Sequence, residues 1–144
     1  MEGRVIAVNI SDQKGISKRP IEEGFFMIDH GLKGDAHAGN WHRQVSLLDT
    51  ESINRMKALG VANLEPGSFA ENITTEGLKL WELPVGTKLQ IGETLQEVTQ
   101  IGKECHTKCA IYQQAGICAM PTEGIFTKVL KEGTIKAGDQ ILVL

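Results

Sequence analysis

The chain has 144 residues, a formal net charge of −3 and three cysteines. This length fits one domain, residues 1–144, that can bury a core without disulfide staples. The acidic balance and scattered basic residues exclude an obvious nucleic-acid-binding protein, and no apolar stretch is long enough to span a membrane. With an odd cysteine count and no signal peptide, we expect a cytoplasmic protein with reduced thiols.

Brief apolar segments alternate with glycine-containing turns, which is typical of a mostly β protein. In the first half of the chain, strands are expected at residues 4–10, 24–29, 44–48 and 71–75. Polar loops are predicted at 11–20 and 30–39. Between the third and fourth strands, apolar residues recur every three positions and predict a helix that ends at Gly60; its N-cap is expected at Asp49 or Thr50.

The second half contains the strongest β signal. Residues 87–91 and 95–101 alternate around a turn at Gly92, so they predict a hairpin. A short helix is expected over 105–114, and the apolar run at 125–130 fits either a helix or a strand. A turn at 133–139 and a final strand at 140–144 follow. Together these elements predict an antiparallel β-barrel with a few short helices.

A cluster of sulfur and cationic groups lies in the second half of the chain. Cys105 and Cys109 share a short segment with Lys103, His106 and Lys108. Nearby cations stabilise a thiolate, the form of cysteine that attacks electrophiles and binds metals. The segment therefore suits sulfur chemistry, although small buried cysteines that only fill space would give the same pattern.

A metal site is a second interpretation of this segment. Cys105, His106, Cys109 and Cys118 offer four nitrogen and sulfur ligands, which suit structural zinc or an iron–sulfur cluster. Cys105 and Cys109, at i and i+4, would share one face of a helix. The paired Cys-x-x-Cys spacing of zinc knuckles is missing, which weighs against this interpretation.

A second polar cluster lies in the glycine-rich first half. Asp35, His37, His42 and Arg43 follow one another closely, and Arg43 could pair bidentately with a phosphate. Alternatively, Asp35 caps a turn and the histidines are solvated. Three residues of the fourth strand could add hydrogen bonds to the same pocket or form a polar strand face: Asn72, Thr74 and Thr75. Trp41 and Trp81 either form a wall of this pocket or fill the core, and we favour the core.

Several segments together resemble one protein family, and they cover most of the chain in the family's order. They are GDAHAG (34–39), RQVSLL (43–48), PGSFAENITTEG (66–77), LPVGT (83–87), VTQIGKECH (98–106) and IKAGD (135–139). This pattern resembles the MOSC domain, the C-terminal domain of molybdenum-cofactor sulfurases, which also occurs as a stand-alone bacterial protein. The chain departs from the family at Glu104, where a proline is frequent, and at Ala70, where a glycine is common.

The resemblance implies a β-barrel that binds the molybdenum cofactor (molybdopterin), or carries sulfur for it, through an essential cysteine. That cysteine maps to Cys105, with Cys109 as the alternative; either thiol could also bind the metal. The residues expected to bind the cofactor are Asp35, His37, Arg43, Asn72, Thr74 and Lys103. Expected partners are molybdenum enzymes or a fused molybdopterin-processing domain, and any pyridoxal phosphate would belong to a separate domain.

Three functions remain open from the sequence. Sulfur transfer in molybdenum-cofactor metabolism would need a reactive cysteine. A non-catalytic module that delivers the cofactor or docks to a partner would need none, and a small structural zinc protein would need the four ligands named above. Nucleotide-dependent and serine-hydrolase chemistry lack their characteristic motifs: there is no Walker loop, dinucleotide fingerprint or GxSxG elbow.

Overall fold

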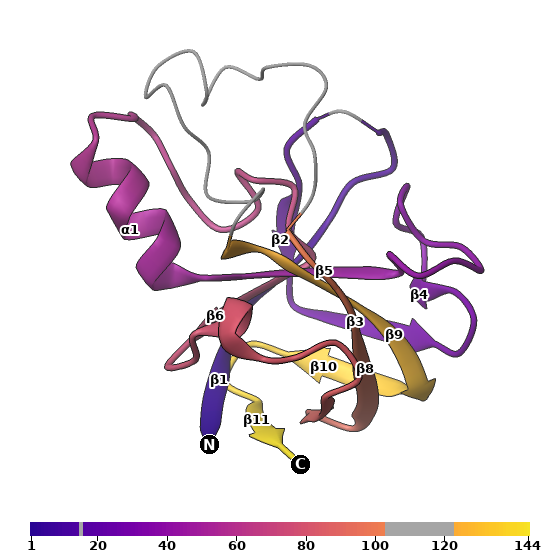
Figure 1. The fold of residues 1–144 in the computed structure, drawn as a ribbon. Helices are drawn as coiled ribbons and strands as arrows, with labels where there is room; N and C mark the ends of the chain where they lie inside the picture. Colours follow the sequence, from indigo (N-terminus) through magenta and orange to yellow (C-terminus); the bar gives the residue numbers. More distant parts are fainter. Residues whose placement is uncertain (15, 103–122) are drawn as a thin grey trace.

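Seven strands close into a barrel in the computed structural model, which describes residues 1–14, 16–102 and 123–144 (Figure 1). In order round the barrel they are β1 (Glu2–Ile10), β6 (Ile73–Glu76), β5 (Val45–Asp49), β9 (Ile125–Lys131), β8 (Thr94–Ile101), β7 (Lys88–Ile91) and β11 (Gln140–Val143). The circuit closes because β11 pairs with both β7 and β1. The predicted mostly β barrel is confirmed.

Further strands extend the barrel at one side. β2 (Arg19–Ile21) pairs with β1, and a small separate sheet contains β10 (Gly133–Lys136), β3 (Glu23–Met27) and β4 (Gly31–Leu32). Among the described pairings, only that of β5 with β6 is parallel. The loop predicted over 11–20 is wrong at its end, where Arg19 and Pro20 belong to β2. A turn was predicted within 133–139 and is present at 137–138, but the strand before it, β10, was not predicted. β10 forms by pairing with β3, a segment far away in the chain.

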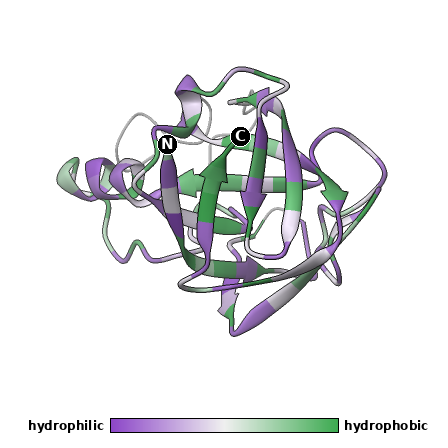
Figure 2. Cartoon of the chain, turned by 90° about the horizontal axis from the view of Figure 1, so that it is seen from below, coloured by the Kyte–Doolittle hydropathy of each residue, from purple (hydrophilic) through white to green (hydrophobic). Residues whose placement is uncertain are grey.

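The barrel interior follows from alternation along the strands. In β7, Leu89 and Ile91 are buried while the residues between and before them are exposed. Figure 2 shows hydrophobic and hydrophilic bands along the barrel strands. In β5 every residue is buried: Leu47 belongs to the barrel core and Leu48 to a second apolar cluster outside it. Successive side chains of a strand point to opposite faces, so β5 is covered on both.

Helix α1 (Thr50–Ala58) covers the outer face of β5, where Ile53 and Met56 join Leu48 in the second cluster. Asp49 is its N-cap, and its side chain accepts a hydrogen bond from the Glu51 amide at 3.0 Å. Leu59, the third apolar residue of the predicted period, forms the C-cap and is 51% exposed. A 3₁₀ turn, η1 (Leu80–Glu82), was not predicted.

The apolar run at 125–130 is a strand, β9, which settles the alternative that periodicity left open. Ile125 and Val129 point into the barrel core, whereas Phe126 packs in the second cluster. A strand buried on both faces reads as a continuous apolar run, which a helix also produces. The helix expected over 105–114 lies outside the described residues. Within the described part of the chain, no helix is long and apolar enough to cross a membrane.

Candidate functional site

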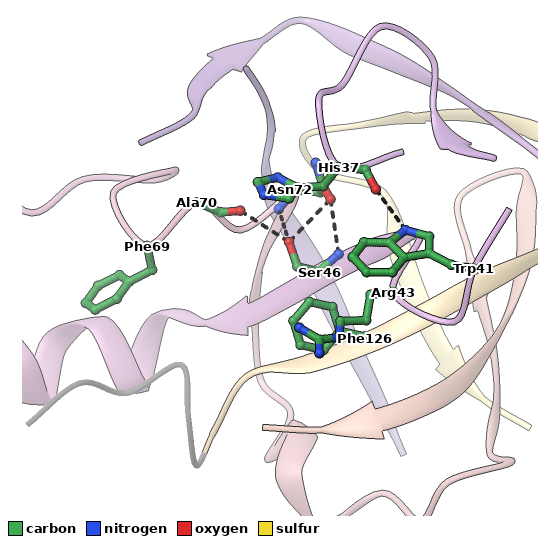
Figure 3. A pocket seen from close by; sticks show the side chains of 8 residues that line it. All are labelled: His37, Trp41, Arg43, Ser46, Phe69, Ala70, Asn72 and Phe126. Atoms are coloured by element: carbon green, nitrogen blue, oxygen red, sulfur yellow. Dashed lines mark hydrogen bonds between the residues drawn. The ribbon is translucent and has the colours of Figure 1, made fainter. Parts of the chain in front are cut away.

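A pocket opens at the edge of the barrel, where the loop after β4 meets β5, β9 and the loop before β6 (Figure 3). Its empty volume is about 480 Å³, counting the part open to solvent. The described residues that line it are His37, Trp41, Arg43, Ser46, Phe69, Ala70, Asn72 and Phe126. The wall therefore combines aromatic rings with hydrogen-bonding groups and a guanidinium, as small-molecule sites commonly do.

Arg43 is the permanent cation of this wall among the described residues. Its guanidinium carbon lies 5.5 Å from the centroid of the Trp41 ring and 5.6 Å from that of Phe126. The two rings hold the cation by cation–π attraction and shield it from water. The Nε atom is buried and has no hydrogen-bond partner among the described residues. A buried donor without an acceptor costs free energy, so this guanidinium is suited to an acceptor brought by a ligand.

The loop that carries Arg43 is tied down at several points. The Trp41 indole Nε1 donates to the His37 carbonyl oxygen at 2.9 Å. Thr99 Oγ1, on β8, donates to the His42 carbonyl oxygen, and the His42 Nε2 lies 2.9 Å from Gln100 Oε1. These contacts fix the loop to the barrel on both sides of Trp41. Arg43 is thus presented by a supported segment.

His37 is backed by a buried ion pair. The Lys18 Nζ lies 2.8 Å from Asp35 Oδ1 and 3.0 Å from His37 Nδ1, and the side chains of Lys18 and Asp35 are fully buried. The Asp35 carboxylate also accepts from the Ser11 and His37 amides. Burial by itself raises the pKa of Asp35. The Lys18 ammonium, the Ser11 amide and the Asn72 side chain together outweigh burial and lower that pKa below its ordinary value.

Asn72 and Ser46 form the floor between β5 and β6. The Asn72 side-chain Oδ1 accepts from the Ser46 backbone amide at 3.1 Å, and the Asn72 backbone amide donates to Ser46 Oγ at 3.0 Å. The Asn72 Nδ2 donates to the Asn9 carbonyl oxygen on β1 at 3.3 Å. Both the oxygen and the nitrogen of the Asn72 side chain are therefore hydrogen-bonded within the protein. The residue links β5 to β1 and fixes the shape of the pocket wall.

A buried carboxylate supports the loop next to this floor. Glu71 accepts from the amides of Gly67 and Phe69, each at 3.1 Å, and from Thr74 Oγ1 at 2.8 Å. Desolvation is the largest influence on Glu71 and raises its pKa despite these hydrogen bonds. The loop holds Ala70 at a φ of 61°, in the left-handed region. Glu71 thus fixes the backbone that carries two pocket residues, Phe69 and Ala70.

The structure brings three of the predicted cofactor-binding residues together at one pocket: His37, Arg43 and Asn72. Asp35 lies behind His37, and Thr74 is fully buried in the Glu71 network, bonded to Glu71 and Asn9 instead of lining the pocket. Thr75 likewise donates to Asp49, away from the pocket. Their contacts with a cofactor stay predictions.

The thiol segment lies outside the described residues. This applies to Lys103, Cys105, His106, Cys109 and Cys118, and hence to every predicted sulfur or metal ligand. Among the residues that are described, no group of three or more His, Cys, Asp or Glu side chains could hold a metal ion. The described residues on either side of this segment are hydrogen-bonded to each other: the Gly102 amide donates to the Gly124 carbonyl oxygen at 2.6 Å. Gly124 comes two residues before Phe126 of the pocket wall.

Sequence reasoning missed four parts of this site and misassigned one. Trp41, for which the core was favoured over the pocket wall, is 41% exposed and lines the pocket wall, where its indole covers Arg43. Trp81 lies half-buried beside Arg55, and is not a core residue either. The parts not foreseen are Lys18, Ser46, Phe69 and Phe126. Phe69 and Phe126 are apolar, so nothing in the sequence marked them as ligand-binding residues. Lys18 lies in a polar stretch that was predicted to be a solvated loop.

Comparison with known proteins gives a consistent result. The MOSC domain family model matches residues 34–142, which include the pocket residues. YuaD from Bacillus subtilis has a similar fold, with a TM-score of 0.81 and 19% identity over 98% of this chain and 94% of that one. YiiM from Geobacillus stearothermophilus has a TM-score of 0.70 and 18% identity over 99% of this chain and 75% of that one.

YiiM from Escherichia coli is similar at a TM-score of 0.67, with 20% identity over all of this chain and 70% of that one. At these identities the solved structures show a common fold. No curated protein matches the chain.

Proposed function

Because this chain belongs to the MOSC domain family, we propose that it binds a molybdopterin-type cofactor in the Arg43 pocket and carries sulfur for it on Cys105 or Cys109. The family gives a role related to the molybdenum cofactor. The pocket supplies the specific argument, because its polar groups suit the anionic part of such a ligand. Each half of the proposal has its own test.

The buried, unpartnered Nε of Arg43 is the observation that supports cofactor binding most directly. Arginine pairs with phosphate through parallel N–H···O bonds, and such charge-assisted bonds are stronger than neutral ones. A pterin cofactor with a phosphate would supply the missing acceptor. Trp41 and Phe126, which flank the guanidinium, keep water from competing for it.

Three uncharged pocket residues, Asn72, Ser46 and Trp41, would complete the binding surface. Asn72 and Ser46 are locked together and give the floor a fixed shape. Trp41 offers an exposed aromatic face at the mouth, on which a planar ring could stack. When bound, the cofactor supplies a metal centre with sulfur ligands for redox or sulfur chemistry, while this chain positions and shields it.

Sulfur carriage would use a cysteine thiolate as nucleophile. The thiolate of Cys105 or Cys109 attacks the terminal sulfur of a persulfide donor; the donor's S–S bond breaks, its own thiolate leaves, and the new persulfide stays on this chain. Sulfur moves without net oxidation. Lys103, His106 and Lys108 support this proposal by their charge, because cations beside a cysteine favour its thiolate.

Arg43→Ala tests cofactor binding. Loss of a hydrogen bond to a charged group costs about 1.5–3 kcal/mol, so affinity for inorganic phosphate and for a phosphorylated pterin should fall by roughly tenfold or more in calorimetric titrations. Arg55→Ala is the matched control, since Arg55 also stacks on a tryptophan, Trp81, but lies on α1 outside the pocket. Equal affinity in the wild type and the Arg43 variant would contradict the proposal.

Cys105→Ser and Cys109→Ser, singly and together, test sulfur carriage. After incubation with a persulfide donor, the intact mass of the wild type should rise by about 32 units for one bound sulfur, which the essential variant should not show. Cys118→Ser serves as the control thiol variant. If the double variant still gains sulfur, neither cysteine is the carrier; if the wild type gains none, the chain acts as a binding or docking module only.

A further inference from the structure

We propose that a β-bulge in β8, formed by Thr99 and Gln100, positions Arg43 in the pocket and so determines how tightly the pocket holds an anionic ligand. Both residues stand outside the described pocket lining and act through His42, the residue before Arg43. The identity of the ligand rests on the proposed function. The effect of the bulge on the loop that carries Arg43 can be measured in the protein alone.

The Arg43 loop, residues 33–44, is a long connection between β4 and β5. Holding each of its residues in one conformation costs entropy, so an ordered loop of this length needs contacts that fix it. The Arg43 guanidinium carbon lies 5.6 Å from the centroid of the Phe126 ring, on β9 (Figure 3). Cation–π attraction and the burial of Nε both depend on this approach. The loop must therefore be held to the barrel close to Arg43.

The contacts that hold it come from an irregularity in the pairing of β8 with β9. The register shifts by one residue between Val98 and Gln100, so Thr99 and Gln100 stand where β9 supplies only Phe126. Consecutive side chains of a regular strand point to opposite faces, and a bulge changes this alternation. Here both side chains reach His42. Thr99 Oγ1 donates to its carbonyl oxygen, and Gln100 Oε1 lies 2.9 Å from its Nε2.

Thr99 also joins the loop to the strand behind it. Its Oγ1 lies 3.1 Å from the Phe126 carbonyl oxygen and also donates to that of His42. A hydroxyl has one proton, so the two carbonyl oxygens share one donor and are held close to each other. Arg43 follows His42 directly and contacts the Phe126 ring. Thr99 thus fixes the separation on which the cation–π contact depends.

Gln100 is itself held in place. Its Nε2 donates to the Gly102 carbonyl oxygen at 2.7 Å, and the Gly102 amide donates to the Gly124 carbonyl oxygen at 2.6 Å. Because the nitrogen end of the Gln100 side chain is fixed to a carbonyl, its oxygen end is the one presented to His42. The second contact with the Arg43 loop therefore also starts from a fixed point on the barrel.

The bulge controls the position of the cation and leaves its charge alone. Without the Thr99 hydroxyl, the Arg43 guanidinium would remain charged, and its long-range attraction for an anion would remain with it. The loop, however, would move more freely against β9. The paired N–H···O bonds that a fixed guanidinium offers to an oxyanion would then form less often. Affinity should fall while its dependence on salt is unchanged.

Tryptophan fluorescence tests the loop contact without a ligand. In a Trp81→Phe background, Trp41 on the Arg43 loop is the single tryptophan. Thr99→Val removes the hydroxyl at nearly constant shape and should raise acrylamide quenching of Trp41 by up to about twofold, since this side chain is 41% exposed in the fixed loop. Thr99→Ser keeps the hydroxyl and should behave as the background protein does. Unchanged quenching in Thr99→Val would overturn the inference.

Calorimetric titration with inorganic phosphate at several salt concentrations shows whether this positioning matters to the ligand. Thr99→Val should bind about three- to tenfold more weakly than the wild type with the same salt dependence, whereas Arg43→Ala should lose both affinity and salt dependence. Thr99→Ser should stay within about twofold of the wild type. Thr134→Val, on β10 away from the pocket, is the matched control and should bind normally.

The outcomes separate the two proposals. Normal binding by Thr99→Val, with Arg43→Ala defective, would overturn the positioning role and leave the proposed function standing. Normal binding by Arg43→Ala would contradict the proposed function, and the fluorescence result would still decide whether the bulge holds the loop. A serine variant as weak as the valine variant would show that the hydroxyl is not the contact. If Thr99→Val does not fold, Gln100→Met removes the second contact and should weaken binding about threefold; normal binding by it would overturn the inference.

Discussion

Removing either half of the Lys18–Asp35 pair should destabilise the fold far more than removing both. Both side chains are fully buried, and Nζ and Oδ1 lie 2.8 Å apart. Lys18→Met leaves a buried carboxylate with no cation beside it, and its remaining donors are the Ser11 and His37 amides and the Asn72 side chain. Asp35→Asn leaves a buried ammonium facing a neutral amide. Breaking a buried pair at one end costs about 3–5 kcal/mol, because the remaining charge is uncompensated.

The double variant, Lys18→Met/Asp35→Asn, contains no buried charge at this point. The Asn oxygen can still accept one of the two backbone amides, so the remaining loss is about that of one unsatisfied donor, roughly 1–3 kcal/mol. The double variant should therefore be more stable than either single variant. Such non-additivity is the signature of a direct contact in a double-mutant cycle.

Urea denaturation at neutral pH measures the free energy of unfolding of all four proteins, and a constant m value checks that the same transition is compared. Lys33→Met, an exposed lysine on the loop after β4, is the control and should change stability by no more than about 0.5 kcal/mol. If each single variant costs less than about 1 kcal/mol, or if the double variant shows the sum of the two losses, the pair is not the buried, coupled contact described.

The pair also predicts a pH dependence. The pKa of Asp35 in the folded protein is lowered, so its stabilisation is fully present above its ordinary value, about 3.9 in the unfolded chain. It should be lost as the pH falls through the lower, folded value. The wild type should therefore lose stability on acidification below about pH 4 more steeply than Asp35→Asn does.

Three further substitutions test the loop beneath the pocket, and a fourth, Gly60→Ala after helix α1, is a control; each is measured by urea denaturation. Gly67→Ala should cost about 3 kcal/mol, because Gly67 has a φ of 92° and a methyl group there would overlap the Lys18 carbonyl; Gly60→Ala, at a φ of 93° with nothing within 4 Å, should cost only about 1 kcal/mol. Ala70→Gly should raise stability by about 0.5 kcal/mol, since relief of the left-handed φ of 61° exceeds the extra entropy of the unfolded chain; a clear loss would contradict this. The pKa of Glu71 is raised in the folded protein, so its contribution to stability is present at low pH and is lost as the pH rises through the folded pKa. Glu71→Gln should remove this loss of stability with rising pH. It should also cost about 1–3 kcal/mol of unfolding free energy, because backbone amides are left without an acceptor. Matching pH profiles in the two proteins would refute the raised pKa.

The sequence predicted the barrel because its main strands alternate or carry continuous apolar runs. It failed where a strand depends on a distant partner. β10 contains Gly133 and Lys136 and pairs with β3, more than a hundred residues earlier in the chain. No local pattern shows such a pairing. The helix N-cap at Asp49 was predicted because capping depends on neighbouring residues, which sequence displays directly.

In the candidate site, too, residues marked by a local motif were predicted and residues that depend on distant contacts were not. Arg43 was foreseen from its place beside a strand, and His37 and Asn72 from their motifs. Lys18 was not, because its role depends on three loops that meet only in the folded barrel. The sequence showed Phe126 only as part of an apolar run, whereas its ring lies 5.6 Å from the Arg43 guanidinium carbon and lines the pocket. The roles of Lys18 and Phe126 depend on tertiary contacts, which no local sequence pattern shows.

The closure of the barrel at β11 and β1 has a consequence for self-association. A strand edge with unpaired amides and carbonyls is a template for intermolecular strand addition, the first step of many aggregates. Within the described chain, the seven barrel strands leave no such edge, because the circuit is complete. The strand that extends it, β2, is three residues long and contains Pro20, which has no amide hydrogen to donate. The barrel itself should therefore offer no template for such strand addition.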